Sequence, residues 1–241
     1  SRIAQQADTR GSGTKATMLF IVDSPDWAHD FKTDNLIRVL GDTYDMRKSY
    51  KCDVTAEQID AADLIVVYYW KEFNDTNMKK VLDVFRRNKH KLLLGICSHC
   101  EMEGRQGRRG LELLKDFAAA VFVNNELLYS EFASCFDVPV FCTPNGVNTE
   151  FFTPGDDKKE SETLRVGWAG SLTNNKDVRG YHDFIVPAVE SVDGVELLTA
   201  AREDKWRDQK EMREFYRSLD VYICASRAEG TPNTCLEAAA C

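Results

Sequence analysis

The segment from Ser226 to Glu237 carries the residue types that a phosphate-binding helix start needs. It reads Ser-Arg-Ala-Glu-Gly-Thr-Pro-Asn-Thr-Cys-Leu-Glu. Thr231 is a residue type favoured as an N-cap, and Pro232 suits the first helical position. The backbone N–H groups that follow have no partner inside the helix, and the helix dipole adds partial positive charge there. We therefore predict an anion site at the start of this helix.

Two acidic residues flank the predicted anion site. Glu229 precedes it, and Glu237 lies beyond Thr231 by roughly 9 Å along the helix axis. A carboxylate before the phosphate can accept the hydroxyl groups of a sugar, and one farther along can accept those of a ribose. The alternative is an ordinary capped helix with an exposed glutamate at each end.

A second group of candidate residues lies earlier in the chain. Val166-Gly-Trp-Ala-Gly170 indicates a glycine-rich strand end, and Lys176 and Arg179-Gly180 follow it. The resemblance described next implies that this strand end and these two cations hold a diphosphate. Solvated loop charges are the alternative for both cations.

These motifs resemble those of the GT-B fold retaining glycosyltransferases of family 4, also called glycosyl transferases group 1. Glu229 and Glu237 have the family's spacing of two glutamates separated by seven residues. Pro144-Asn-Gly-Val-Asn148 and the later Phe152-Thr-Pro154 are similar to its interdomain crossing. The chain departs from the family at Ser171, where an arginine is usual, and in the first loop, 23–31, which has no glycine.

The resemblance implies two Rossmann-like domains that face a cleft, and transfer of a sugar, of the hexosyl type, from a nucleoside diphosphate sugar to an acceptor hydroxyl with retention. It implies that Glu229 and His99 are catalytic, with His99 facing the donor sugar from the first domain. The implied donor-binding residues are Gly170, Ser171, Lys176, Arg179, Glu229, Gly230, Thr231, Pro232, Asn233, Thr234 and Glu237.

The position of His99 agrees with this role, because it follows the apolar run 91–97 and open parallel sheets bind ligands at the carboxyl ends of their strands. A loop histidine with local hydrogen bonds is the alternative, and His29, after the first predicted strand, is a rival.

The pattern Cys97-Ser-His-Cys100 lacks a well-spaced second pair for zinc and a thioredoxin-like context. The sequence has no Asp-x-Asp for a divalent ion, so we expect no metal and no cofactor.

Apolar runs that alternate with helical patterns must position these residues, and they predict an α/β fold with parallel sheets. We expect strands at 17–22, 62–69, 91–97, 118–123, 139–142, 164–169, 195–199 and 221–225. We expect helices at 31–40, 78–87, 126–136, 181–192 and 210–217, and one that starts near Pro232.

Four segments follow from this pattern: a flexible leader (1–16), an acceptor-side Rossmann-like domain (17–153), a polar linker (154–163) and a donor-binding domain (164–241). The last has three strands, so we expect it to be truncated, or incomplete at Cys241.

The amino-acid composition and net charge exclude some classes of function. The net charge of −8 argues against nucleic acid as a partner, which requires a basic face. No stretch is long and apolar enough for a transmembrane segment, and the eight cysteines, mostly in apolar runs, suit a cytoplasmic location. The expected partners are a nucleotide-sugar donor and an unidentified acceptor that is a glycan, a lipid-linked molecule or a small molecule. The alternatives are an inactive or truncated GT-B relative acting as a sugar-nucleotide-binding or assembly module, and a sugar-nucleotide epimerase.

Overall fold

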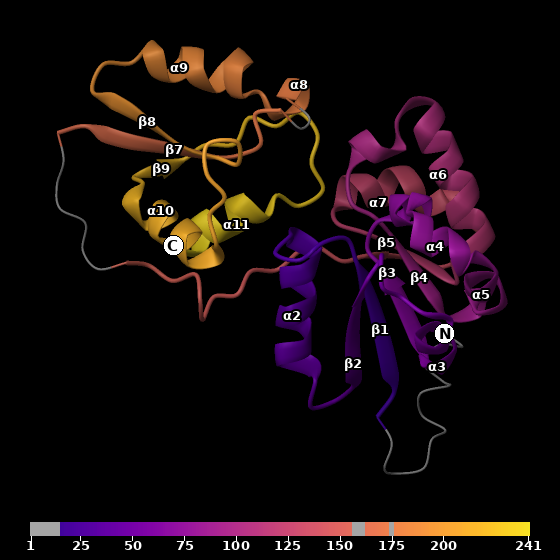
Figure 1. Ribbon diagram of the computed structural model, residues 1–241. Coiled ribbons are helices and arrows are strands. Elements are labelled where there is room, and N and C mark those ends of the chain that lie inside the picture. Colours follow the sequence, from indigo (N-terminus) through magenta and orange to yellow (C-terminus); the bar gives the residue numbers. More distant parts are fainter. Residues whose placement is uncertain (1–14, 156–161, 174–175) are drawn as a thin grey trace. The chain divides into compact units, whose positions relative to one another are not determined.

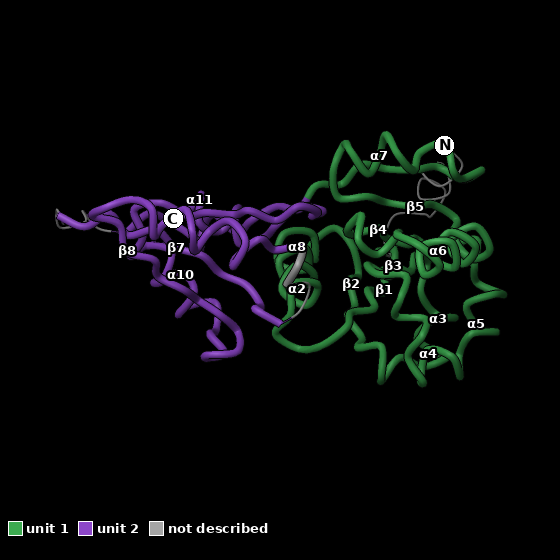
Figure 2. The backbone as a smooth tube through the Cα atoms, turned by 90° about the horizontal axis from the view of Figure 1, so that it is seen from above, with its two compact units in different colours: residues 1–144 green, residues 145–241 purple. Residues whose placement is uncertain are grey.

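The computed structural model describes residues 15–155, 162–173 and 176–241, without the side chains of residues 176 and 177. The chain divides into two compact units, residues 1–144 and 145–241 (Figure 2). The division falls after Pro144, whereas the sequence suggested residue 153. Most of the predicted leader and the centre of the predicted linker lie outside the described residues.

The first unit is a six-stranded, fully parallel sheet in the order β2-β1-β3-β4-β5-β6 (Figure 1). Its strands are β1 (Thr17–Val22), β2 (Asp45–Tyr50), β3 (Leu64–Val67), β4 (Leu92–Ile96), β5 (Ala120–Val123) and β6 (Val140–Cys142). Its helices are α2 (Ala28–Leu40), α3 (Ala56–Ala61), α4 (Thr76–Lys80), α5 (Leu82–Arg87), α6 (Gly104–Phe117) and α7 (Glu126–Phe132). The topology confirms the predicted parallel sheet, and the strand order reverses direction between β1 and β3.

Alternation along β1 shows that this sheet is buried on both faces, because successive side chains of a strand point to opposite sides. Leu19 and Ile21 belong to one hydrophobic cluster, which includes residues of α3, α5, α6 and α7. Phe20 and Val22 belong to another, against which Leu36 of α2 packs. Helices therefore cover both faces, as in doubly wound folds.

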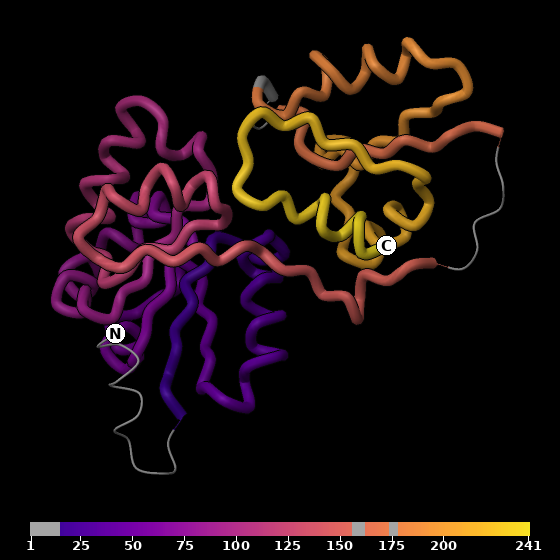
Figure 3. The backbone as a smooth tube through the Cα atoms, turned by 180° about the vertical axis from the view of Figure 1, so that it is seen from behind, coloured from indigo at the N-terminus to yellow at the C-terminus, as the bar shows by residue number. Residues whose placement is uncertain are grey.

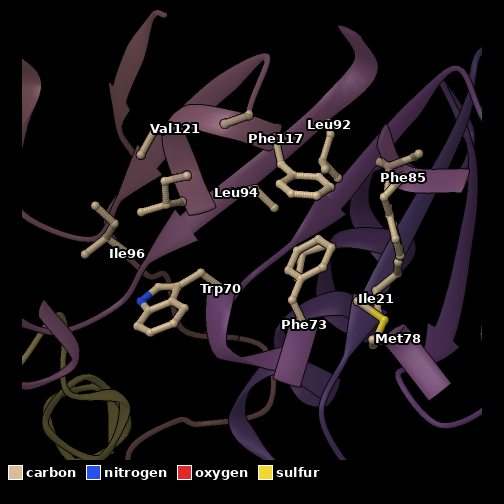
Figure 4. Close-up of a cluster of buried hydrophobic side chains, with 14 of the residues drawn as sticks. Ile21, Trp70, Phe73, Met78, Phe85, Leu92, Leu94, Ile96, Phe117 and Val121 are labelled. Carbon is tan, nitrogen blue, oxygen red and sulfur yellow. The ribbon is translucent and has the colours of Figure 1, made fainter. Parts of the chain in front are cut away.

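The larger cluster forms the main core of the first unit (Figure 4). Trp70, Phe85 and Leu94 are among its fully buried side chains. Burying each such side chain contributes about 1.5–3 kcal/mol before conformational entropy is subtracted. This core fixes the strands and hence the positions of the residues at their carboxyl ends.

Three elements of the first unit, β2, α3 and α6, were not predicted, and one predicted helix is interrupted. β2 is an edge strand of mostly polar residues, and it pairs with β1 alone. The first turns of α6 are rich in glycine and arginine, so its apolar periodicity appears late. The helix expected at 78–87 is divided at Val81, whose φ of −104° and ψ of 14° end α4 before α5 begins.

The second unit contains a three-stranded parallel sheet in the order β8-β7-β9. Its strands are β7 (Leu164–Gly170), β8 (Val195–Ala201) and β9 (Val221–Tyr222). Its helices are α8 (Lys176–Arg179), a π-helical segment (Tyr181–Ile185), α9 (Val186–Glu190), α10 (Gln209–Ser218) and α11 (Asn233–Ala240). The three expected strands are thus present, although β9 is shorter than predicted.

Residues 145–154 run beside α10 and α11 and belong to the second unit (Figure 3). Phe152 is buried in one cluster with Tyr216 of α10, and Ala240 of α11 packs against that cluster. Arg217 of α10 donates to the carbonyl and hydroxyl oxygens of Thr153 at 2.8 and 2.7 Å. These contacts explain why the division between the units precedes this segment.

In the described parts of the chain, no helix is both long and apolar enough to cross a membrane.

Candidate functional site

The start of α11 differs by one residue from the sequence prediction. Pro232, not Thr231, is the N-cap residue, because its ψ of 110° is extended rather than helical. Among the described residues no side chain caps this helix. The N–H groups of Cys235 and Leu236 bond to the Pro232 carbonyl. Asn233 and Thr234 therefore supply the first backbone donors of α11, at the end where the helix dipole favours anions.

Asn145 fixes the backbone immediately before this helix. Its side-chain amide donates to the Thr231 carbonyl at 3.1 Å and to the Asn233 side-chain oxygen at 2.9 Å. The crossing motif at 144–148 thus positions a loop more than eighty residues away in sequence. Sequence reasoning missed this link, since a contact of such separation leaves no local signal.

Arg179 and Glu229 come together beside the same loop. The Arg179 Nη1 atom lies 3.6 Å from Glu229 Oε1, and each side chain is about 30% exposed. A backbone bond from Arg227 N–H to the Val178 carbonyl holds α8 against the loop that carries Glu229. Arg179 Nε is buried and has no hydrogen-bond partner among the described residues. A cation with an unused donor therefore adjoins the predicted sugar-binding carboxylate.

Two glycines allow this close approach. Gly180 follows α8 with a φ of 68°, and an added Cβ would lie 2.5 Å from the Ala225 carbonyl oxygen. At Gly170 a Cβ would lie 2.7 Å from the Trp168 ring and 3.5 Å from the Arg179 side chain. Lys176 begins α8, but its side chain lies outside the described residues.

The loop after β7, which the resemblance assigns to the diphosphate, holds a carboxylate of the chain itself. The Ser171 hydroxyl donates to Glu203 Oε1 at 2.5 Å, and the Leu172 N–H donates to Glu203 Oε2 at 2.9 Å. Thr173 donates to Glu203 Oε1 through its N–H and its hydroxyl. These hydrogen bonds, that of Ser171 foremost, hold the pKa of Glu203 well below its usual range. Ser171, where the family has an arginine, thus binds an internal anion.

Glu237 faces the interior of the second unit. Its Oε2 atom accepts a hydrogen bond of 2.8 Å from the hydroxyl of Tyr216 on α10. Burial raises the pKa of Glu237 to about 7, although the Tyr216 bond lowers it in part. The two glutamates of the motif therefore lie in different surroundings, Glu229 beside a cation and Glu237 beside a buried phenol.

In the first unit, His99 follows β4 as expected, in a short 3-10 helix (His99–Met102). Its Nε2 atom lies 3.3 Å from Glu131 Oε2 of α7, and its side chain is 26% exposed. The structure thus gives His99 an acidic partner within its own unit.

A polar cluster at the carboxyl ends of β1, β3 and β4 surrounds the rival histidine, His29. Its ring stacks on Tyr68 with the centroids 5.0 Å apart, and its nitrogens lie 3.7 Å from Asp23 and 3.8 Å from Cys97. Burial lowers the pKa of His29 and raises that of Cys97. The Cys97 thiol donates to the Tyr68 carbonyl at 2.9 Å. Within the described residues, no group of three or more His, Cys, Asp or Glu side chains could hold a metal ion.

No protein-family model matches the chain. No curated protein matches it in sequence.

Several solved structures match it in fold. TarM aligns at 12% identity with a TM-score of 0.54, over 88% of this chain and 42% of TarM. Alr3699/HepE of Anabaena, in complex with UDP-glucose, aligns at 12% identity with a TM-score of 0.59, over 93% of this chain and 78% of HepE. The N-terminal domain of Candida albicans trehalose-6-phosphate phosphatase aligns at 11% identity with a TM-score of 0.59, over 96% and 82%.

At 11–12% identity, these structural matches establish a likeness of fold alone. The matches support a GT-B type of fold, which is the fold of the family whose motifs the sequence resembles. The chain spans less than half the length of TarM.

Proposed function

We propose that this chain belongs to a glycosyltransferase that moves a sugar from a nucleoside diphosphate sugar to an acceptor hydroxyl, with the donor bound by residues 164–241. The observation that carries the proposal is the Arg179–Glu229 pair, which places a cation beside the loop that leads into α11. The fold likeness to HepE, which was solved with UDP-glucose, supports a nucleotide-sugar donor.

The proposed chemistry is stabilisation of a diphosphate leaving group. Negative charge grows on the diphosphate as the sugar bond breaks, and fixed donors that face this charge lower the barrier. Arg179 and the first N–H groups of α11 supply a positive charge and oriented dipoles without a metal ion. These groups are available without displacing Glu203, which occupies the loop after β7. Retention at the anomeric carbon and the family 4 assignment rest on the motif resemblance.

Glu229 is proposed to accept sugar hydroxyls, and Glu237 to face the ribose once Tyr216 releases it.

His99 remains the proposed catalytic histidine of the first unit, with His29 as its rival. Comparing His99→Gln with His29→Gln in a transfer assay would separate them, since the variant of the uninvolved histidine should retain turnover. The acceptor is a glycan, a lipid-linked molecule or a small molecule, and the proposed location is the cytoplasm.

The first experiment is a thermal-shift screen of the full chain against UDP, GDP, ADP and their sugars. A ligand at about 100 times its Kd stabilises the folded state by about 2.7 kcal/mol. Arg179→Ala should weaken binding of the best ligand at least ten-fold, because a hydrogen bond to a charged group contributes about 1.5–3 kcal/mol. Arg86→Ala is the matched control, since Arg86 is an exposed arginine of the first unit paired with Asp83. Equal affinity in both variants would exclude the proposed diphosphate site.

A second candidate function is a sugar-nucleotide-binding or assembly module without turnover. Glu203 in the loop after β7 favours it, because a carboxylate occupies donors expected to serve a phosphate. The fold also matches the N-terminal domain of a trehalose-6-phosphate phosphatase, so the fold alone does not fix the activity. A donor-hydrolysis assay separates the two functions. Steady release of nucleoside diphosphate that is lost in Glu229→Ala supports the transferase, and binding without release supports the module.

A further inference from the structure

The loop at residues 171–173 directs four donor groups at one carboxylate. The hydroxyls of Ser171 and Thr173 and the N–H groups of Leu172 and Thr173 all bond to Glu203, at 2.5 to 3.2 Å. Both carboxylate oxygens are engaged, since Leu172 bonds to Oε2 and the other groups to Oε1. Two consecutive N–H groups and two hydroxyls that converge on one anion form the kind of concave donor set that binds phosphates.

The position of this loop also suits a ligand. It follows β7, the central strand of the parallel sheet in the second unit, and ligands of such sheets bind beyond the carboxyl ends of the strands. Glu203 reaches it from the residues that follow β8, the neighbouring strand. Ser171 is 7% exposed, whereas Glu203 is an exposed residue. The donors are therefore fixed in the fold, and the carboxylate can move into solvent.

We propose that Glu203 is an internal competitor that closes the 171–173 loop, so that one phosphate of the donor binds there only after displacing this carboxylate. The inference deepens the proposed function and rests on it for the identity of the natural ligand. Two anions cannot share the same four donors, because like charges at contact distance repel and each would lose its hydrogen bonds. Glu203 thus sets the affinity for the diphosphate and disfavours weak anionic competitors.

The expected gain in phosphate affinity follows from the fraction of molecules whose loop is free of Glu203. The apparent Kd of a ligand equals its intrinsic Kd divided by the fraction of molecules whose site is open. A carboxylate held by several charge-assisted hydrogen bonds leaves that fraction at about a tenth or less. Removing the carboxylate should therefore tighten phosphate binding at least ten-fold.

The test uses inorganic pyrophosphate, which contains neither sugar nor base, and isothermal titration calorimetry of the full chain. Glu203→Gln and Glu203→Ala should each bind pyrophosphate at least ten-fold more tightly than wild type. Glu190→Gln is the matched control, because it removes the same charge from an exposed position of the same unit. It should change the Kd less than two-fold. Equal pyrophosphate affinity in wild type and both Glu203 variants would overturn the proposal.

A double variant tests whether the added pyrophosphate affinity arises at the 171–173 loop. Adding Ser171→Ala to Glu203→Gln should abolish most of the gained affinity, because Ser171 is one of the four donors. A gain that persists would place the pyrophosphate elsewhere and refute the subsite. Circular dichroism of each variant checks folding, and the glutamine variant keeps the side-chain length if the alanine variant unfolds.

The pyrophosphate test and the transferase assay can fail independently of each other. Tighter pyrophosphate binding without any turnover of nucleotide sugars supports the subsite and counts against the transferase. Transferase activity with a donor KM unchanged by Glu203→Gln counts against the subsite and leaves the transferase standing.

Discussion

Replacing Glu237 with glutamine should stabilise the folded chain above pH 7 and have little effect near pH 4.5. Burial raises the pKa of Glu237 from 4.5 to about 7. The folded state therefore holds the proton more tightly than the unfolded state between these pH values. The stability linked to this group is fully present below pH 4.5 and is lost as the pH rises to about 7. Glutamine never ionises, so the variant escapes this loss.

The magnitude follows from the size of the shift. The pKa difference between 4.5 and about 7 corresponds, at 1.36 kcal/mol per pKa unit, to about 3 kcal/mol between pH 4.5 and pH 8. The Tyr216 hydroxyl, 2.8 Å from Glu237 Oε2, can donate equally well to a glutamine oxygen. The variant should therefore keep the hydrogen bond and avoid the cost of a buried charge.

Urea denaturation followed by circular dichroism, at pH 4.5, 6, 7 and 8, provides the test. The free energy of unfolding of Glu237→Gln minus that of wild type should grow with pH and level off near pH 8. Glu190→Gln serves as the exposed control and should show no such trend. A difference that is the same at all four pH values would refute a protonated, buried Glu237.

Three further predictions concern packing, thiol reactivity and capping. Gly167→Ala should destabilise the second unit by about 1–3 kcal/mol, as measured by urea denaturation, because the new Cβ would lie 2.1 Å from the Leu219 side chain. Cys97 should react with iodoacetamide at least ten-fold more slowly than exposed Cys52, as measured by peptide mass spectrometry, because burial keeps its thiol protonated; equal rates would contradict this. Thr55→Ala should lower the free energy of unfolding by about 1 kcal/mol in the same urea assay, because it removes the capping box of α3. Thr55→Ser keeps a capping hydroxyl and should restore the wild-type stability.

Strongly apolar strands were predictable from the sequence because burial on both faces leaves a continuous local pattern. β1, β4 and β5 are such runs, and their parallel pairing follows from the helices between them. β2 was missed because it is a polar edge strand that is specified by its pairing with β1. The division of the helix at Val81 likewise depends on backbone angles that the apolar spacing does not report.

The sequence by itself determined which residues are candidates for the site. Glu229, Arg179 and the start of α11 are motif positions whose order along the chain was enough to single them out, and the structure places Arg179 beside Glu229. The individual roles of the site residues remain proposals.

Only the tertiary structure decided the partners of the site residues. Asn145 holds the Thr231 carbonyl, Glu203 occupies the loop beyond Ser171, and Tyr216 binds Glu237. Each pair joins residues at least 21 positions apart in sequence. A motif records which side chains are present, but the direction in which a carboxylate points depends on donors that other elements supply. The sequence therefore named the groups that could bind a diphosphate, and the fold decided that the donors of the 171–173 loop bind Glu203.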